Sequence, residues 1–453
     1  MRRLAVGVVF LAIAAATFWA GVSAQAPSNK LTMPLVYTAA TQYDAEAWLR
    51  GGERFPAGAQ VMVRENGNAR VPVPGFAVST DPNISFDGKR MLFAGKREAR
   101  DSWQIWEVSL DGGAAKAITA CNVDCLRPFY LPDNRLVYAR RVDGRFVVET
   151  ASLDGGTALQ LTYGPGNAMP TDVLLDGRIL FEASYPLGNG QSPEIYTVYS
   201  DGSGVEAYRC DHGPQRQAGR QSASGDILFA RGRGLGRFTS ALAHEVEFHA
   251  PEGEFAGDVV ETPGGDYVMS WRSDVKSRYS LRSLDPKTGS FDAIVVAGDA
   301  DLVQPALVEA RRVPNQHPSG LHEWNYANLL CLNAYTSKYN FAPGTIAAMR
   351  LYTTNEKGET KLLGSSSAEA DGSFYVRVPA DRPLQIELLD RTGKTLKREQ
   401  GWWWMRKGEQ RICVGCHPGP ERSPENAVPA VLLKTTAPVD LSGATTMPHT
   451  GGR

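Results

Sequence analysis

Apolar and polar residues recur in short, regularly spaced hairpins through the first two thirds of the chain. Each hairpin has an apolar strand, a turn of Asp, Asn and Gly, and a second apolar strand that carries Phe, Tyr or Trp. Five copies are legible, at residues 84–96, 129–141, 172–184, 221–233 and 259–271. Their turns contain Gly88, Asn134, Gly177, Gly225 and Gly265. These residue types tolerate the positive φ angles of tight hairpins.

The spacing of these turns predicts a β-propeller. Successive turns are 46, 43, 48 and 40 residues apart. Most hairpins are followed by a further strand and an Asp-Gly or Asp-Pro turn, as at 103–113 and 146–156. Four strands for every 40–45 residues is typical of propeller blades. We therefore expect a β-propeller over residues 34–314. The alternative, one or two β-sandwiches, agrees less well with the regular period.

A sixth blade is expected to combine the two ends of this region. Residues 302–314 have the pattern of an innermost strand without a hairpin after it. Residues 34–39, 59–65 and 69–74 have the pattern of outer strands without an inner strand before them. Joining the two sets closes a six-bladed ring and removes the edges that an open array would expose.

A second all-β unit is predicted after the propeller. Residues 313–324 are rich in Pro, Gly and His and mark the boundary. Residues 345–354, 360–379 and 383–402 alternate with period two, which predicts a small β-sandwich-like domain over 315–410. The predicted fold class is thus all-β: a six-bladed β-propeller, a β-sandwich-like domain and a C-terminal segment that carries the candidate chemistry.

The N-terminus has the pattern of a secretory signal peptide over residues 1–26. Arg2 and Arg3 precede an uncharged apolar run, and small residues follow it. The alternative is an uncleaved anchor, because the run is long enough to span a bilayer. We expect an exported, periplasmic protein with no transmembrane segment after cleavage. The chain has 48 basic and 49 acidic side chains, a balance that gives no reason to expect nucleic acid as a partner.

Six cysteines in 453 residues are too few for disulfides to build this fold. Cys121 and Cys125 are four positions apart and could close one small disulfide loop in an oxidising compartment. Cys210 and Cys331 are far from the others in sequence, and we expect them to be buried thiols.

The remaining cysteines form a C-x-x-C-H motif, Cys413, Cys416 and His417, within the stretch RICVGCHPGPE. Four explanations were compared: haem attachment, zinc, a redox dithiol and coincidence. A zinc site needs about four ligands, and the sequence has no second C-x-x-C or H-x-x-x-H pair. A thioredoxin-type dithiol lies in a βαβ setting, whereas the pattern here is β-rich. Chance pairing of so few Cys and His residues is a weak explanation.

Haem c is the favoured interpretation. The two thiols would form thioethers with the haem vinyl groups, and the adjacent imidazole would bind the iron. Covalent attachment after export agrees with the signal peptide. We expect one covalent haem c on the segment 411–430, followed by a flexible tail at 431–453. The three consecutive tryptophans at 402–404 must pack on a large apolar partner, either the sandwich core or a porphyrin.

Two resemblances extend this picture. The hairpin pattern D-G-(K/R)-x-(L/I)-x-F, with a trailing L-D-G-G, resembles the TolB-like, WD40-like PD40 propeller family. From the propeller to about Pro429, the chain resembles the hydrazine synthase alpha subunit family. The runs that carry this resemblance are S-x-x-x-x-D-G-S-F, L-L-D-x-x-G, R-K-G-E and C-V-G-C-H. It implies thioether bonds at Cys413 and Cys416 and a proximal imidazole at His417. The family's enzyme has a second haem and a tyrosine shortly after the motif, but residues 418–424 contain no Tyr.

The ligand on the opposite face of the iron is not determined by the motif. The candidates are Met405, His322, Met447 and His449, with His317 as a further histidine near the domain boundary. A Met ligand would suit electron transfer, and an empty position would suit small-molecule chemistry.

The leading functional hypothesis is an exported mono-haem cytochrome that exchanges electrons with a redox partner or within a larger complex. The alternatives are a haem enzyme acting on a small nitrogen or oxygen species, and a TolB-like propeller binding module.

Overall fold

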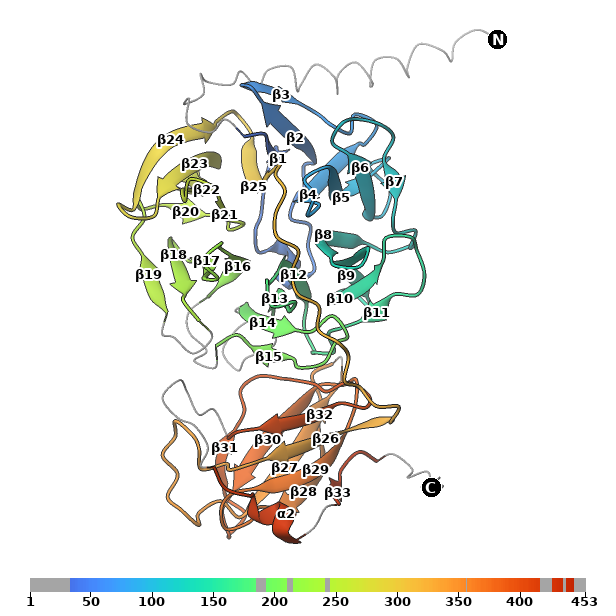
Figure 1. Ribbon diagram of the computed structural model, residues 1–453, viewed down its shortest axis with the longest axis vertical. Coiled ribbons are helices and arrows are strands. Elements are labelled where there is room, and N and C mark those ends of the chain that lie inside the picture. Colours follow the sequence, from blue (N-terminus) through green and yellow to red (C-terminus); the bar gives the residue numbers. More distant parts are fainter. Residues whose placement is uncertain are drawn as a thin grey trace.

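The protein is nearly all β, and its strands form eight sheets in the residues that the structure describes. The computed structural model describes residues 33–184, 193–209, 215–240, 245–355, 357–415, 426–434 and 437–443. Six sheets are arranged in a ring, and two more form a second unit beside it (Figure 1). The predicted fold class is confirmed. The predicted signal peptide lies outside the described residues. No described helix is long and apolar enough to span a bilayer.

The six blades follow one another around the ring. Blade 1 has β4 (Val78–Ile84), β5 (Arg90–Lys96), β6 (Gln104–Ser109) and β7 (Lys116–Ala117). Blade 2 has β8 (Cys125–Leu131), β9 (Arg135–Val142), β10 (Arg145–Ser152) and β11 (Leu159–Gln160). Blade 3 has β12 (Ala168–Val173), β13 (Ile179–Ala183), β14 (Glu194–Val198) and β15 (Glu206–Ala207). Blade 4 has β16 (Gln217–Gln221), β17 (Ile227–Arg231), β18 (Gly234–Phe238) and β19 (Val246–Phe248).

Blade 5 has an interrupted inner strand, and blade 6 joins both ends of the propeller sequence. Blade 5 contains β20 (Glu254–Phe255), β21 (Val260–Glu261), β22 (Tyr267–Arg272), β23 (Ser280–Asp285) and β24 (Ser290–Val296). Blade 6 contains β25 (Asp301–Leu307), β1 (Leu35–Ala40), β2 (Ala59–Glu65) and β3 (Asn68–Arg70). The inner strand β25 pairs antiparallel with β1. Thr38 of β1 also donates a buried hydrogen bond to Gln304 of β25 at 2.8 Å.

Apolar side chains fill the spaces between neighbouring blades. One cluster joins Phe129 and Val137 of blade 2 to Phe181 and Tyr196 of blade 3. Every residue of β1 and of β8 is buried. Because these two strands have neighbours on both faces, their burial is continuous and does not alternate.

Two segments of the chain cover opposite faces of the propeller. The linker after β25 crosses one face on its way to the second unit (Figure 1). There the Arg311 N–H donates to Phe86 O, and the Asn315 N–H donates to Leu175 O. The blade turns beneath it need glycine, because a Cβ at Gly177 would lie 2.4 Å from Asn315 O.

The loop between β1 and β2, residues 41–58, covers the other face, because β1 runs antiparallel to β25. It includes the short 3-10 helix η1 (Ala47–Arg50) and contacts all six blades. These contacts pair Arg54 with Asp81, Gly51 with Arg141, Leu49 with Asn167, Glu46 with Gln217, Tyr43 with Tyr279, and Tyr43 with Asp301. We call this segment the axial loop.

The second unit is a sandwich of two four-stranded sheets. One sheet has the order β32 (Gln410–Cys413), β26 (Tyr326–Cys331), β29 (Phe374–Pro379) and β33 (Val439–Asp440). The other has the order β28 (Thr360–Ser367), β27 (Ala348–Thr354), β30 (Leu384–Leu389) and β31 (Thr395–Arg398). Their facing apolar side chains form a single core, which includes Leu329 of β26 and Leu351 of β27.

The segment after residue 430, expected to be a flexible tail, packs on the sandwich in its described part. The short helix α2 (Ala430–Lys434) begins where the Val431 N–H donates to Ser373 Oγ at 3.0 Å. Strand β33 then pairs parallel with β29, and Leu441 is buried in the sandwich core. The apolar residues of 430–441 follow neither a helical nor a strand period, so the sequence gives no clear signal for this docking.

Candidate functional site

The first cysteine of the C-x-x-C-H motif is the last residue of β32, at the edge of its sheet among the described residues. Strand β32 runs parallel to β26, with Cys413 opposite Cys331. The ladder continues one residue further, where the Leu332 N–H donates to Cys413 O at 2.9 Å. Cys413 therefore belongs to the sandwich sheet, whereas the sequence placed it in a separate segment. Cys416 and His417 lie outside the described residues.

Side chains on β32 alternate between the sandwich core and its outside. Cys413 packs against the core. Burial raises the pKa of its thiol to about 11, against the lowering effect of Arg411. Ile412 and Val414 on either side are 64% and 41% exposed. The motif thus begins with a protonated, inward-facing thiol between two exposed apolar side chains.

Gly415, between the two cysteines of the motif, lies against the loop that follows β26. A Cβ at this position would lie 2.1 Å from Thr336 O and 3.0 Å from Asn333 O. Only glycine fits this approach without a backbone shift, since the nearest atom is a main-chain oxygen. The conformation of the motif is therefore coupled to residues 333–337.

The described candidates for the second iron ligand lie in different environments. Met405 is fully buried in the sandwich core. His322 is exposed, stacks on Trp324 with ring centroids 4.4 Å apart, and has its Nε2 3.0 Å from Gln410 Nε2. Gln410 is three residues before Cys413 on β32, so His322 lies roughly 10 Å along the strand from the motif. His317 stacks on Tyr199 of the propeller at 3.7 Å. Met447 and His449 lie outside the described residues.

The turn that leads into β32 is fixed to blade 3 of the propeller. Arg406 and Glu409 close the turn, because the Arg406 N–H donates to Glu409 Oε2 at 2.8 Å. Glu409 also accepts from the Gly204 N–H at 3.2 Å and from Arg411 Nη2 at 2.7 Å. Arg411 in turn donates to Val205 O at 3.1 Å. The R-K-G-E run is therefore an inter-domain clamp that positions the strand of the motif.

Of the three consecutive tryptophans, Trp403 and Trp404 lie where the two domains meet. Trp404 is fully buried among blade 2 and blade 3 residues, beside Phe181 and Tyr163. Trp403 is partly buried against both the propeller and the sandwich cores. Its Nε1 donates to Glu399 Oε2 at 2.7 Å. Burial raises the pKa of Glu399 to about 7, although the hydrogen bonds from Ile386 and Trp403 oppose the shift. Trp404 thus uses the propeller as its apolar partner, an option that the sequence analysis did not consider.

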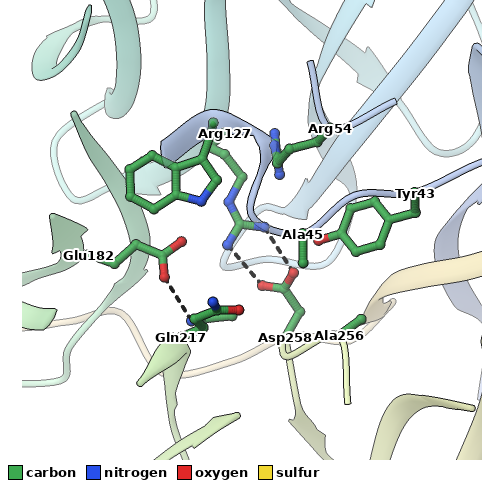
Figure 2. Close-up of a pocket in the computed structure, with 10 residues that line it drawn as sticks. Tyr43, Ala45, Arg54, Arg127, Glu182, Gln217, Ala256 and Asp258 are labelled. Atoms are coloured by element: carbon green, nitrogen blue, oxygen red, sulfur yellow. Dashed lines mark hydrogen bonds and ion pairs between the residues drawn. The ribbon is translucent and has the colours of Figure 1, made fainter. Parts of the chain in front are cut away.

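A second candidate site lies beneath the axial loop, at the centre of the ring (Figure 2). It is a small pocket lined by Tyr43, Ala45, Trp48, Arg54, Arg127, Glu182, Gln217, Ala218, Ala256 and Asp258. Arg127 of blade 2 makes a two-pronged ion pair with Asp258 of blade 5, at 2.9 and 3.1 Å. Burial alone would raise the pKa of Asp258, but Arg127 and Arg220 hold it at about 2.

The inner strands of several blades have a bulge, and buried polar residues at these bulges link the blades around this pocket. Five residues there adopt positive φ angles: Asp81, Arg127, Ala218, Asp258 and Gln304. Asp81 accepts from the Arg54 and Gln304 side chains and from the Arg127 N–H. The carboxylate of Glu182 accepts from the Ala218 N–H at 3.0 Å. Burial raises the pKa of Glu182 to about 7. We call these five residues, together with Glu182, the axial cluster. Sequence reasoning missed it.

The described cysteines outside the C-x-x-C-H motif lie in the propeller and in the sandwich. Cys121 and Cys125 lie at the junction of blades 1 and 2 with their Sγ atoms 2.8 Å apart. Cys331 is buried, and Cys210 lies outside the described residues. Among the residues that the structure describes, no three His, Cys, Asp or Glu side chains gather as a metal-binding group.

Comparisons with known proteins locate the sequence similarity at the motif. Residues 333–418 match the family model described as the hydrazine synthase alpha subunit middle domain. Over 55 residues the chain is 36% identical to hydrazine synthase subunit alpha of Kuenenia stuttgartiensis, a match that covers 12% of this chain and 7% of that protein.

The similarity of the fold extends further than that of the sequence. The structure of Kuenenia stuttgartiensis hydrazine synthase superposes with a TM-score of 0.76 and 16% identity, over 89% of this chain and 71% of that one. TolB from Acinetobacter baumannii gives a TM-score of 0.47 and 14% identity, over 62% and 68% of the two chains. The predicted resemblance to the hydrazine synthase alpha middle domain is confirmed.

Proposed function

We propose that this chain is an exported c-type haem protein that exchanges electrons with a redox partner. One haem c would be attached to Cys413 and Cys416, with His417 as an iron ligand. The observation that carries the haem part of the proposal is the match over residues 333–418, which includes Cys413, Cys416, His417 and the loop packed on Gly415.

The described residues can hold a haem at this edge of the sandwich once the Cys413 side chain turns outward from the core on which it packs. Strand β32 is paired only through β26 in the described sheet, so a large planar group beside it interrupts no described ladder. Ile412 and Val414 provide exposed apolar surface next to the attachment point, of the kind that marks a ligand or partner contact. When bound, the haem supplies one-electron chemistry.

The chain's own residues hold the attachment strand in place. Arg411 and Glu409 tie it to blade 3, and Gly415 holds the motif against the loop after β26. Such supporting contacts keep a cofactor site in one geometry. The propeller then serves as the platform to which the haem domain is fixed. Since the matched relative is named a subunit, we also propose that this chain works in a larger assembly or with a redox partner protein.

Mass spectrometry of the exported protein tests the proposal. Co-expression with a haem maturation system should add the mass of one haem to the processed chain. The addition should disappear in a Cys413→Ser/Cys416→Ser double variant and persist in a Cys331→Ser variant. A wild-type mass equal to that of the bare processed chain would overturn the proposal and leave the propeller binding module as the remaining hypothesis.

A second candidate function is a haem enzyme that acts on a small nitrogen or oxygen species. The match to the hydrazine synthase alpha middle domain favours it. Visible absorption spectra of the haem-loaded protein distinguish the two functions. A six-coordinate, low-spin haem supports electron transfer. A five-coordinate, high-spin haem that rapidly binds nitric oxide or peroxide supports small-molecule chemistry.

A further inference from the structure

Cys121 and Cys125 form a close pair of thiols at the junction of blades 1 and 2, in the core cluster that includes Trp48 of the axial loop. Cys121 lies in the loop between β7 and β8, and Cys125 is the first residue of β8. Their Sγ atoms are 2.8 Å apart, compared with about 2.05 Å in a disulfide bond. A small side-chain movement is therefore enough to join them.

The loop that brings the two thiols together is held by hydrogen bonds independent of the sulfurs. Gln104 Nε2 donates to Cys121 O at 2.8 Å and to Val123 O at 3.1 Å, while the Cys121 N–H donates to Gln104 Oε1 at 3.0 Å. The Cys125 N–H donates to Trp103 O at 2.8 Å. These bonds fix both ends of the loop, so the pairing of the sulfurs does not depend on a covalent bridge.

The two thiols differ in access and in acidity. Cys125 is fully buried in a core cluster with Trp48 and Phe146, whereas Cys121 is only partly buried. The hydrogen bond from Cys125 lowers the pKa of Cys121 to about 7, and Arg140 contributes in the same direction. The same hydrogen bond and burial raise the pKa of Cys125. Cys121 is thus the accessible thiol with thiolate character, which is the requirement for a nucleophile.

We propose that Cys121 and Cys125 form a reversible redox site that exchanges with a disulfide co-reactant, with Cys121 as the attacking thiol and Cys125 as the resolving thiol. The Cys121 thiolate attacks one sulfur of the co-reactant R–S–S–R, and one RS⁻ leaves. Cys125 then loses its proton and attacks Cys121 Sγ, which releases the second RS⁻. Two protein thiols become one disulfide, and the co-reactant takes up two electrons and two protons as two RSH.

The length of the loop favours a reversible bond over a structural one. The bridge would close a loop of only five residues, from Cys121 to Cys125. The entropic stabilisation from a disulfide grows with the length of the loop that it closes, so this one adds less to folding, about 2 kcal/mol, than a bridge over a long loop would. Both the oxidised and the reduced forms are therefore expected to keep the propeller fold.

Redox titration of the full-length exported protein with glutathione and glutathione disulfide tests the proposal. After acid quenching and alkylation, peptide mapping should show the Cys121–Cys125 bridge rising and falling reversibly with the glutathione ratio. In the reduced protein, iodoacetamide should modify Cys121 at least tenfold faster than Cys125. A bridge that never forms, or one that is reduced only after unfolding, overturns the proposal.

Single variants test the assigned roles. Cys125→Ser should accumulate a stable mixed disulfide between Cys121 and glutathione, and Cys121→Ser should accumulate none at Cys125. Equal mixed-disulfide formation in the two variants overturns the assignment. The alkylation rates in the wild-type protein keep the test valid if either variant misfolds. Repeating the titration in the Cys413→Ser/Cys416→Ser background separates this site from the haem proposal, since the same bridge is expected there.

Discussion

Trp404 and Met405 are neighbours in sequence, yet their side chains lie in the cores of different domains. Trp404 is fully buried in the propeller, and Met405 is fully buried in the sandwich. The chain therefore crosses from one core to the other within a single peptide unit, a few residues before the strand that begins the C-x-x-C-H motif. This shared anchoring makes the joint between the domains part of the candidate site.

Replacement of Trp404 by alanine should destabilise the protein by about 3–5 kcal/mol, because it empties a large buried space between blades 2 and 3. Urea unfolding followed by circular dichroism measures the change. Leu433→Ala, at a side chain that is 74% exposed, is the control and should stay within about 0.5 kcal/mol of wild type. A Trp404→Ala loss as small as that of the control would contradict the shared core.

Replacement of Arg127 by methionine should cost about 3–5 kcal/mol, because it leaves buried Asp258 with one ion-pair partner fewer. The free energy of unfolding from a denaturant titration measures this loss. Arg100→Met is the matched control, since its ion pair with Glu98 is exposed and should contribute at most about 1 kcal/mol. Equal effects of the two substitutions would show that the axial cluster does not hold the blades together.

The stability of the protein should fall as pH rises from about 4.5 through about 7. Folded Glu182 keeps its proton up to a pKa of about 7, whereas the unfolded carboxyl loses it near 4.5. The unfolded state therefore binds fewer protons in this window, and each rise in pH favours unfolding. Glu399 has the same raised pKa and adds to the effect.

Glu182→Gln should remove the contribution of Glu182 to the pH dependence of the free energy of unfolding. This contribution is on the order of 1–3 kcal/mol between pH 5 and 8. Thermal unfolding across this pH range gives the measurement. Glu399→Gln should flatten the profile in the same way, and the double variant should flatten it further. A Glu182→Gln profile parallel to that of the wild type would exclude a protonated Glu182 in the folded protein.

Gly415→Ala should lower the fraction of chains that carry covalent haem, because the new methyl group would press on the Thr336 and Asn333 carbonyl oxygens. The backbone shift needed to relieve this overlap is expected to cost about 1–3 kcal/mol. Intact mass measurement of the protein co-expressed with a haem maturation system gives the loaded fraction. Gly320→Ala provides the control, since a Cβ there meets no atom within 4 Å. Wild-type loading in Gly415→Ala would show that the loop after β26 does not set the conformation of the motif.

Met405→Leu should leave the visible spectrum of the haem-loaded protein unchanged, because the Met405 side chain is enclosed in the sandwich core. The volume-conserving substitution should also cost less than about 1.5 kcal/mol in stability. The spectrum of His322→Ala, recorded in parallel, tests the exposed candidate near β32. A change from low-spin to high-spin haem in Met405→Leu would mean that Met405 leaves the core to bind iron.

The sequence carried enough local information to predict the propeller. Each blade repeats a hairpin with a turn that favours positive φ, such as Gly88 or Asn134, at a similar spacing. Such signals depend only on neighbouring residues, so they can be recognised without knowledge of the ring. The fold class followed from them.

The axial cluster could not be predicted in the same way. The bulge of the inner strand carries Asp81, Arg127, Ala218, Asp258 or Gln304, depending on the blade, so four different residue types occupy these five positions and the repeat gives no consistent signal there. Each of the charged residues finds its partner on another blade, and only the closed ring brings Arg127 to Asp258. Likewise, the run of three tryptophans indicated that Trp404 is buried, but no neighbouring residue indicated which domain would bury it.

Blade 6 also has a consequence for how the protein is made. One of the two partner strands of β1, the inner strand β25, lies more than 250 residues later, as the hydrogen bond between Thr38 and Gln304 shows with its separation of 266 positions. During synthesis, β1 can pair with β2, but its other edge stays unpaired until nearly the whole propeller sequence has emerged. Contacts of such long range close slowly and leave intermediates prone to aggregation. Ring closure is thus expected to be the late, rate-limiting step of maturation, at which the nascent chain depends most on chaperones.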